Sequence, residues 1–264
     1  MEQAPASPAP SAAMPGLGGI FSAATNATLD NAGVLLGLWA LCSLPSQLLG
    51  FVVGLITGLT DQNAVKDAIS GQNWPALGML AIVALVAMAL GLIGYAATIL
   101  LAARALRGES SSVTDLFVEA LGRMGSVLLA SAMIGAALGF GFILFVIPGI
   151  YLFVRLSLAV CATLVEDLSA REGLSRSWEL VGGSFGETVV FMAALIAAAL
   201  VGMIPAVIVN VVLRAGSAAA GAGAAGALLS GLVFNALQFM VTAWAAGCMT
   251  KYFLELAARK PRAS

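Results

Sequence analysis

The stretch "MGSVLLASAMIGAALGFGFILFVIPGIYLFVRLSLAVCATLV", residues 124–165, decides how many times the chain crosses a membrane. Its 42 residues hold a single charge, Arg155. A helix needs about 20 apolar residues to cross a hydrocarbon core about 30 Å thick, so the stretch is long enough for two crossings. The pair Pro148-Gly149 lies inside it, and a proline followed by a glycine breaks a helix and permits a tight turn. We therefore predict two spans, over residues 124–146 and 150–165, joined by this structural turn.

The composition of the chain is that of an integral membrane protein. Of its 264 residues, 61% are hydrophobic and 9% are charged, and the mean hydropathy is +1.02. A soluble domain has roughly 45–50% apolar and about 25% charged residues. Four further charge-free runs are each long enough for a span, so we expect an all-α fold, a polytopic membrane helical bundle of six transmembrane helices. The predicted spans cover residues 32–59, 76–103, 124–146, 150–165, 188–213 and 225–250.

The predicted six-span membrane domain covers residues 18–258 and is flanked by two tails. Residues 1–17 begin with "MEQAPASPAPSAAMPG" and have neither the basic flank nor the apolar core of a secretory signal. Their Ala, Pro and Ser content predicts a disordered N-terminal tail. Residues 259–264 hold three basic residues, which predict a basic C-terminal tail that anchors the topology at the membrane surface.

Lysine and arginine residues predict the orientation, because they are retained on the cytoplasmic side of a membrane. With six spans, nine of the twelve basic residues fall on the side of the termini, two fall on the other side, and Arg155 lies within a span. The two on the other side are Lys66 and Arg214. We therefore predict a multi-pass protein of the plasma membrane, the inner membrane of a bacterium, with cytoplasmic N- and C-termini.

The middle of the chain contains a repeat with an offset of 57 residues. "SVTDLF" at Ser112 aligns with "SAREGL" at Ser169, and Ile147-Pro148 aligns with Ile204-Pro205. The polar start and the proline are 36 residues apart in both copies, which is harder to obtain by chance than matches between apolar residues. We predict hairpin repeats, each made of a short interfacial amphipathic helix, an ascending span, an Ile-Pro turn and a descending span. Pro205 is then a second structural turn.

The segment that follows Ser169 has the pattern of an interfacial entry helix. Ser169 and Glu172 have the spacing of a capping box, in which hydroxyl and acid each satisfy a free backbone N–H. On a helical wheel, Trp178 lies on the less polar side, while Arg176 lies on the charged side and can pair with neighbouring acids. Such a helix lies along the membrane surface with its tryptophan at headgroup depth. Gly182-Gly183 is predicted to end it with a left-handed cap.

Residues 147–185, "IPGIYLFVRLSLAVCATLVEDLSAREGLSRSWELVGGSF", resemble the signature of a known membrane domain. This six-span domain precedes some glycerophosphoryl diester phosphodiesterases and also occurs alone in bacterial membrane proteins. The shared features are a Pro-Gly turn, an arginine in the next span, an acid that closes it, and the pattern L-x-R-S-W-x-L-x-x-G. The matching residues are Pro148, Gly149, Arg155, Glu166, Leu174, Arg176, Ser177, Trp178, Leu180 and Gly183.

Two departures limit what the resemblance implies. Cys161 stands where a second proline is expected, and no catalytic domain follows in this sequence. The resemblance therefore implies a membrane architecture without an activity. The chain also has no histidine, which removes the usual neutral-pH general base and the commonest zinc ligand. No acids face each other inside a span, so we predict no catalytic residue, cofactor or metal site, and a protein that is not an enzyme.

Arg155 is the first candidate for contact with a lipid or an anion. A charged residue within a span costs roughly 2.5–3.5 kcal/mol on insertion scales, so it is usually paired or functional. Two interpretations stay open: a cation that locks helices together, or an anchor for a lipid phosphate or an anionic substrate. Arg176 and Trp178 are the other candidate contacts. Four further polar side chains within spans are predicted to form hydrogen bonds between helices: Gln47, Asn210, Asn235 and Gln238.

These observations favour an integral membrane protein with a structural, assembly or lipid-interacting role. Its predicted partners are membrane lipids, with a membrane-protein partner or a second copy of the chain as open alternatives, and no nucleic acid. The alternative function is a transporter or channel component for a small or anionic, amphiphilic solute. In that case the repeat interface encloses the path and Arg155 contacts the substrate.

Overall fold

The computed structural model describes residues 16–58 and 62–261, and all regular structure in these ranges is helical. Most of the predicted N-terminal tail, and residues 262–264 of the basic tail, lie outside the described residues. The helices are α1 (Leu17–Asp30), α2 (Ala32–Thr57), α3 (Gln62–Ser70), α4 (Trp74–Ala105), α5 (Val113–Gly122), α6 (Met124–Leu144), α7 (Val146–Leu156), α8 (Ala159–Val165), α9 (Ala170–Gly182), α10 (Phe185–Ala219) and α11 (Gly223–Arg259).

Six helical segments of the described chain are long and apolar enough to cross a membrane, as the sequence predicts. The predicted all-α, polytopic fold class is confirmed, and the chain is an integral membrane protein. The bounds of the six segments lie close to those of the predicted spans at most ends. The segments are Ala32–Thr57, Trp74–Ala105, Met124–Ile143, Val146–Val165, Phe185–Ala219 and Ala225–Arg259.

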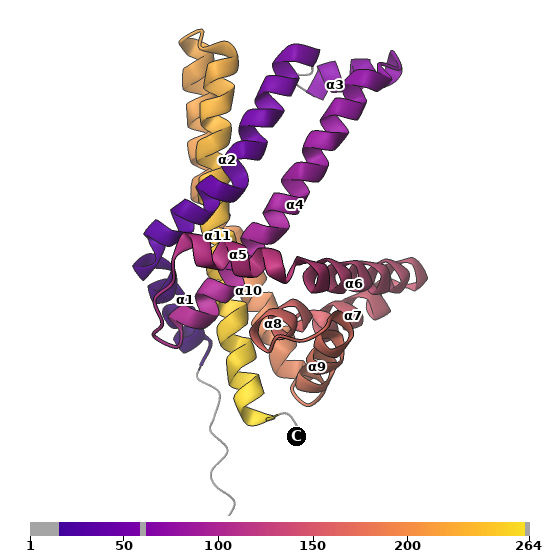
Figure 1. The fold of residues 1–264 in the computed structure, drawn as a ribbon, viewed down its shortest axis with the longest axis vertical. Coiled ribbons are helices and arrows are strands. Elements are labelled where there is room, and N and C mark those ends of the chain that lie inside the picture. The colour runs from indigo at the N-terminus through magenta and orange to yellow at the C-terminus, as the bar shows by residue number, and fades with distance from the viewer. Residues whose placement is uncertain (1–15, 59–61, 262–264) are drawn as a thin grey trace, which may run out of the picture.

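The long helices form two antiparallel hairpins that diverge toward one end (Figure 1). One hairpin is α2 with α4, joined through α3, and the other is α10 with α11. We call the end that carries α3 the α3 end, and the end at which α11 finishes the terminal end. The hairpin of α6 and α7 runs across the direction of the other four, because it packs on the short helices α8 and α9 near the terminal end.

The predicted turn between the third and fourth spans exists, but it lies before the Pro-Gly pair. The backbone is extended at Phe145, with φ −166° and ψ 154°, and α7 starts at the next residue. Pro148 therefore sits in the first turn of α7, where its missing N–H has no helical partner to lose. At Gly149 a Cβ would approach the Phe142 ring to 2.6 Å, so this glycine allows α6 and α7 to pack closely. The predicted span 150–165 is also divided, into α7 and α8.

The predicted structural turn at Pro205 is wrong. Helix α10 continues through Pro205 to Ala219, and the turn to α11 occupies residues 220–222. Membrane helices tolerate proline because neighbouring groups satisfy the freed carbonyl. Residues 216–219 and 223–227 on either side of this turn are helical, as their alanine content favours. The repeat holds for the entry helices, which begin 57 residues apart at Val113 and Ala170, but not for the turns.

The capping box at the start of α9 is confirmed. The Oγ atom of Ser169 accepts a hydrogen bond from the backbone N–H of Glu172 at 3.5 Å, and the Ser169 N–H donates to Glu172 Oε2 at 3.0 Å. At the start of α5, Oγ of Ser112 likewise accepts from the N–H of Asp115 at 3.1 Å. Both entry helices therefore begin at a side-chain cap that the sequence specifies.

We predict that Ser169→Ala lowers the free energy of unfolding by about 1 kcal/mol, because it removes the hydroxyl that accepts a backbone N–H of α9. Thermal unfolding in detergent measures this loss. Ser175→Ala, an exposed serine inside the same helix, is the matched control and should leave the transition within about 0.5 kcal/mol of wild type. Equal transitions for the two variants would show that the cap contributes nothing to stability.

Candidate functional site

Three of the long helices each carry a line of polar or small residues at helical spacing. Residues three, four or seven positions apart lie on one face of a helix, so each line forms a stripe. The stripes face one another where α2, α4 and α11 meet. The stripe of α2 holds Ser43, Ser46 and Gln47, that of α4 holds Gly91, Tyr95 and Thr98, and that of α11 holds Asn235, Gln238 and Thr242.

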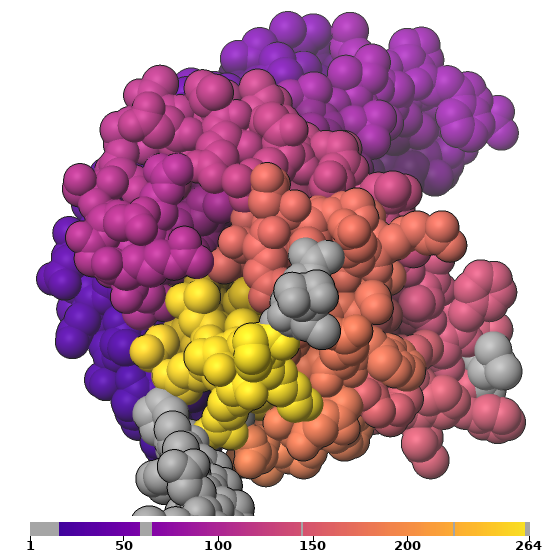
Figure 2. Space-filling view, turned by 60° about the horizontal axis from the view of Figure 1, so that its bottom comes forward, coloured from indigo at the N-terminus to yellow at the C-terminus, as the bar shows by residue number. Residues whose placement is uncertain are grey.

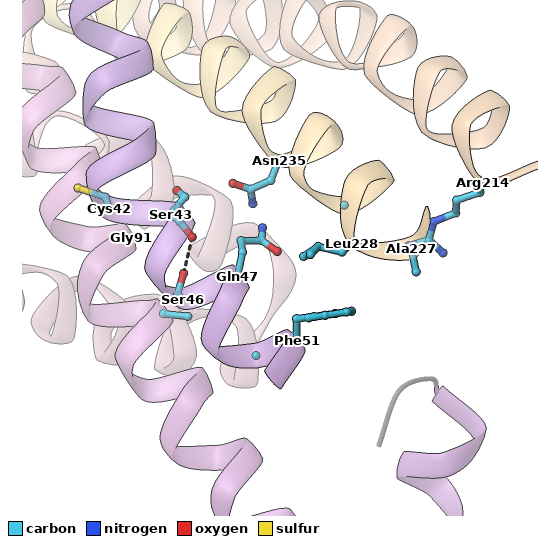
Figure 3. Close-up of a pocket in the computed structure, with 13 residues that line it drawn as sticks. Cys42, Ser43, Ser46, Gln47, Phe51, Gly91, Arg214, Ala227, Leu228 and Asn235 are labelled. Atoms are coloured by element: carbon cyan, nitrogen blue, oxygen red, sulfur yellow. Dashed lines mark hydrogen bonds between the residues drawn. The ribbon is translucent and has the colours of Figure 1, made fainter. Parts of the chain in front are cut away.

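Between these stripes lies a cleft of about 580 Å³, drawn in Figure 3. We call it the polar cleft. It opens where the two hairpins diverge, and α10 contributes one residue to its edge. Its lining residues are Cys42, Ser43, Ser46, Gln47, Gly50, Phe51, Ala87, Gly91, Arg214, Ala227, Leu228, Gly231 and Asn235.

Several polar groups of these stripes have no protein partner. The indole Nε1–H of Trp39 donates to Asn235 Oδ1 at 2.9 Å, which joins α2 to α11. The side-chain amides of Gln47 and Gln238 make no hydrogen bond within the described part of the chain. In hydrocarbon an unpaired amide costs several kcal/mol, so these groups require water or a polar ligand. The prediction of interhelical bonding therefore holds for Asn210, which donates to the Ser230 carbonyl at 3.1 Å, and for Asn235, but not for the two glutamines.

Arg214 is the one charged residue among those that line the polar cleft. It comes from α10 and lies at the edge of the cleft near Ala227 (Figure 3). Its side chain is exposed, and within residues 16–58 and 62–261 it forms no ion pair. With no acid in the lining, the cleft has a net positive charge. The opposite wall is apolar at Phe51, so the site combines one cation, neutral hydrogen-bonding groups and hydrocarbon surface.

A proline beside the cleft favours the divergence of α2. Pro45 lies inside α2, between Ser43 and Ser46, and has no N–H to bond the carbonyl one turn earlier. Next to the proline, Ser46 donates its hydroxyl to the Ser43 carbonyl at 2.9 Å. Prolines are a common cause of helix bends, and at the α3 end α2 lies away from α11 in Figure 1.

Arg155, the first site residue expected from the sequence, lies outside the polar cleft and joins α7 to α9. Its Nε–H donates to the Tyr151 hydroxyl and its Nη1 donates to the Trp178 carbonyl, both at 3.0 Å. The guanidinium lies 4.7 Å from the centre of the Trp178 ring and 5.9 Å from that of Phe185. These contacts match a cation that holds helices together. A contact of Arg155 with lipid phosphate stays a prediction.

Arg176 is buried, with 6% of its surface exposed, although the helical wheel places it on the charged side. Its Nε–H lies 3.2 Å from Glu166 Oε2, its Nη1 lies 3.7 Å from Glu179, and its Nη2 donates to the Lys260 carbonyl at 2.8 Å. A helical wheel shows only how the residues of one helix are arranged around its axis. It cannot show that α8 and the end of α11 supply partners for Arg176 on the inner side. Trp178 is 41% exposed, and its position at headgroup depth stays a prediction.

The predicted left-handed cap at the end of α9 is wrong, because Gly183 has φ −94°. The last carbonyls of α9 are instead satisfied by cations: Lys260 Nζ donates to the Glu179 and Leu180 carbonyls at 3.2 Å. A Cβ at Gly182 would lie 2.6 Å from Nη1 of Arg155, and a Cβ at Gly183 would collide with Lys260 Nζ. The two glycines therefore make room for the cations. Figure 2 shows the end of α11 set against the neighbouring α9 surface.

The structure thus separates two regions. Arg155, Arg176 and Trp178 form one cluster at the terminal end, while the polar cleft lies between the diverging hairpins. Sequence reasoning missed the cleft as a site, although the spacing of Asn235, Gln238 and Thr242 was a signal for it. In comparisons with known proteins, no protein-family model, no curated protein and no solved structure matches the chain.

We predict that Arg176→Met lowers the free energy of unfolding by about 2–3 kcal/mol, since it leaves the Glu166 carboxylate and the Lys260 carbonyl without their partner. The melting temperature in detergent measures the loss. Arg171→Met removes an exposed arginine from the same helix and should change stability by about 0.5 kcal/mol or less. If both variants melt alike, the buried ion pair is not what holds α9 in place.

Proposed function

We propose that this protein binds an anionic amphiphile, a molecule with one negative head group and an apolar chain, in the polar cleft between α2, α4 and α11. The observation that carries the proposal is the combination inside one cleft, among the described residues, of a single cation without an ion pair, the side-chain amide of Gln47 without a hydrogen-bond partner, and an apolar wall. This is a lipid-interacting role. We further propose that it is exercised in the plasma membrane, the inner membrane of a bacterium.

The head group is recognised by charge and by hydrogen bonds. A guanidinium offers two parallel N–H donors to a phosphate or carboxylate, and Arg214 at the edge of the cleft has no competing carboxylate among its described neighbours. Further in, the amide of Gln47 and the Nδ2 group of Asn235 can donate to remaining head-group oxygens. The ligand thereby replaces the hydrogen bonds that these amides lack.

The apolar chain is accommodated by the rest of the lining. Phe51 and Leu228 border the cleft on α2 and α11, and Ala87 and Gly50 leave space between them. A volume of about 580 Å³ lies within the range of about 300–1,000 Å³ that is usual for ligand pockets. An open cleft of this kind does not help a purely structural protein. A packed apolar interface between the helices would be more stable than one that leaves a side-chain amide without a hydrogen-bond partner.

The charge distribution supports placing the α3 end outside. Lys66 and Arg214 lie toward this end, whereas the cluster of Arg155, Arg176 and Lys260 and most other basic residues lie toward the terminal end. Basic residues favour the cytoplasmic side, so the amphiphile would enter from the outer leaflet. The resemblance of residues 147–185 to the membrane domain that precedes some glycerophosphoryl diester phosphodiesterases fits a role among phospholipids, although none of these residues lines the cleft.

We predict that a cysteine at position 66 (Lys66→Cys) reacts with a membrane-impermeant maleimide added to intact cells. Ser110→Cys, in the exposed connection after α4, should react only after the membrane is permeabilised. The native Cys42, Cys161 and Cys248 are buried, so their background is low. The opposite labelling pattern would invert the proposed orientation and place the mouth of the cleft in the cytoplasmic leaflet.

We predict that Arg214→Gln weakens binding of a chain-labelled phosphatidylglycerol about tenfold, because a charge-assisted pair contributes about 1.4 kcal/mol or more. The measurement is fluorescence anisotropy of the probe with the protein in phosphatidylcholine nanodiscs. Lys66→Gln is the matched control: it removes an exposed cation toward the same end that does not line the cleft, and it should leave the dissociation constant unchanged.

Chain-labelled phosphatidylcholine serves as the second probe in the same assay. It has the same chain but no net charge, so it should bind more weakly to the wild type. Its dissociation constant should be the same for Arg214→Gln as for the wild type. Equal affinity for both probes, or equal loss in both variants, would contradict recognition of an anion by the polar cleft.

A further inference from the structure

Two smaller cavities continue the polar cleft toward the terminal end. The first holds about 180 Å³ and shares four lining residues with the cleft: Cys42, Ser43, Gly91 and Asn235. The second holds about 10 Å³ and shares Thr98 and Ala243 with the first. The three cavities therefore lie in series along α2, α4 and α11, and their volume falls from one end to the other.

The last cavity is a constriction. Its volume of about 10 Å³ is at the lower limit of the space for one water molecule, so no head group passes it in this conformation. Helix α1 closes it from the side at Ala27 and Thr28, and α2 closes it at Leu35. The remaining lining residues come from α4 and α11 and are mostly small: Thr98, Leu101, Ala102, Ala243 and Gly247.

We propose that these cavities form a translocation path, along which the head group of the anionic amphiphile moves between the two leaflets while its chain stays in the bilayer. The proposal rests on the proposed binding function and extends it to a transport activity. The described conformation is open at the α3 end and closed at the constriction. In this proposal the head group moves down its own concentration difference between the leaflets, so the movement is passive.

Polar groups continue beyond the cleft, where a span would otherwise be apolar. Gln238 and Thr242 on α11 and Thr98 on α4 line the middle cavity. The hydroxyls of Thr98 and Thr242 donate to carbonyls of their own helices, at 2.7 Å and 3.0 Å, and keep lone pairs that can accept from water or from a hydroxyl of the head group. Because a bare charge is expensive in hydrocarbon, successive polar groups lower the barrier to moving a head group past them.

The constriction is built so that helices can move apart with little loss of packing. Gly247 of α11 faces Ala24 of α1, where an added Cβ would lie 3.5 Å from the alanine Cβ. Ala102 and Ala243 line the gap between α4 and α11. Small residues let helices approach and shift without withdrawing interlocked side chains. The proline in α2, at the level of the cleft, gives this helix a place to bend.

The test uses the full-length protein in vesicles of phosphatidylcholine that contain chain-labelled fluorescent phosphatidylglycerol. Dithionite added outside bleaches the probe in the outer leaflet, and bleaching beyond that share reports translocation. We expect wild-type vesicles to bleach beyond it, and protein-free vesicles to stop there. Ala102→Leu should slow translocation at least about tenfold by filling the constriction, while binding at the cleft is retained. Ala84→Leu, the same change at an exposed position of α4, should behave as wild type.

A second variant covers the case in which Ala102→Leu does not fold. Thr98→Val keeps the volume but removes the hydroxyl of the constriction, and it should also slow translocation without weakening binding. Wild-type vesicles that bleach no further than protein-free ones, with probe binding intact, would overturn the path and leave the binding function standing. Loss of selective binding in the nanodisc assay would instead overturn the binding function itself. Translocation that is unchanged in both variants would place the path elsewhere.

Discussion

The structure depends on one constraint, that backbone N–H and C=O groups in hydrocarbon must be satisfied within the chain. In a sequence with 9% charged residues and spans of 26–36 residues without charge, this leaves helices as the available structure. The constraint also makes each polar side chain inside a span conspicuous, because it needs a partner there. The side chains of Trp39 on α2 and Asn235 on α11 are hydrogen-bonded to each other. The side-chain amides of Gln47 and Gln238 have no such partner in the described part of the chain. The first pair is therefore a structural contact, whereas the two glutamines mark places where water or a ligand is needed.

The same constraint explains the terminal end. The last carbonyls of a helix have no partner in their own helix, and in α9 those of Glu179 and Leu180 receive bonds from Lys260. Arg155 donates to the carbonyl just before them, that of Trp178. Cations also interact favourably with the negative end of the helix dipole. Each member of the Arg176-Ser177-Trp178 triplet then has a distinct contact: Arg176 donates to the Lys260 carbonyl, Ser177 donates to the Arg155 carbonyl at 2.8 Å, and Trp178 receives the guanidinium on its ring and carbonyl. These contacts tie α7, α9 and the end of α11 together.

The sequence predicts what depends on local pattern and misses what depends on neighbours. Length and hydropathy give the spans, and the spacing of Ser169 and Glu172 gives the start of α9. Pro205 shows the limit of this reasoning. From the sequence a proline predicts the end of a helix, but it can remain inside a membrane helix where neighbouring groups replace the lost backbone hydrogen bond. The burial of Arg176 and the convergence of three polar stripes into a cleft were not predictable, since both arise from contacts between segments far apart in the chain.

The two regions differ in the contacts that hold their helices together. At the terminal end, ion pairs and capped carbonyls fix the short helices to α11. Toward the α3 end the two hairpins diverge, and among the described residues one side-chain hydrogen bond joins them at the cleft, from Trp39 to Asn235. A ligand that reaches from Arg214 on α10 to Gln47 on α2 spans the gap between the hairpins and so stabilises the conformation in which they are closer. The proposed ligand would therefore couple binding at the cleft to the angle between the hairpins. Because the same helices α2, α4 and α11 continue into the constriction, a change in that angle reaches the point at which the path is closed.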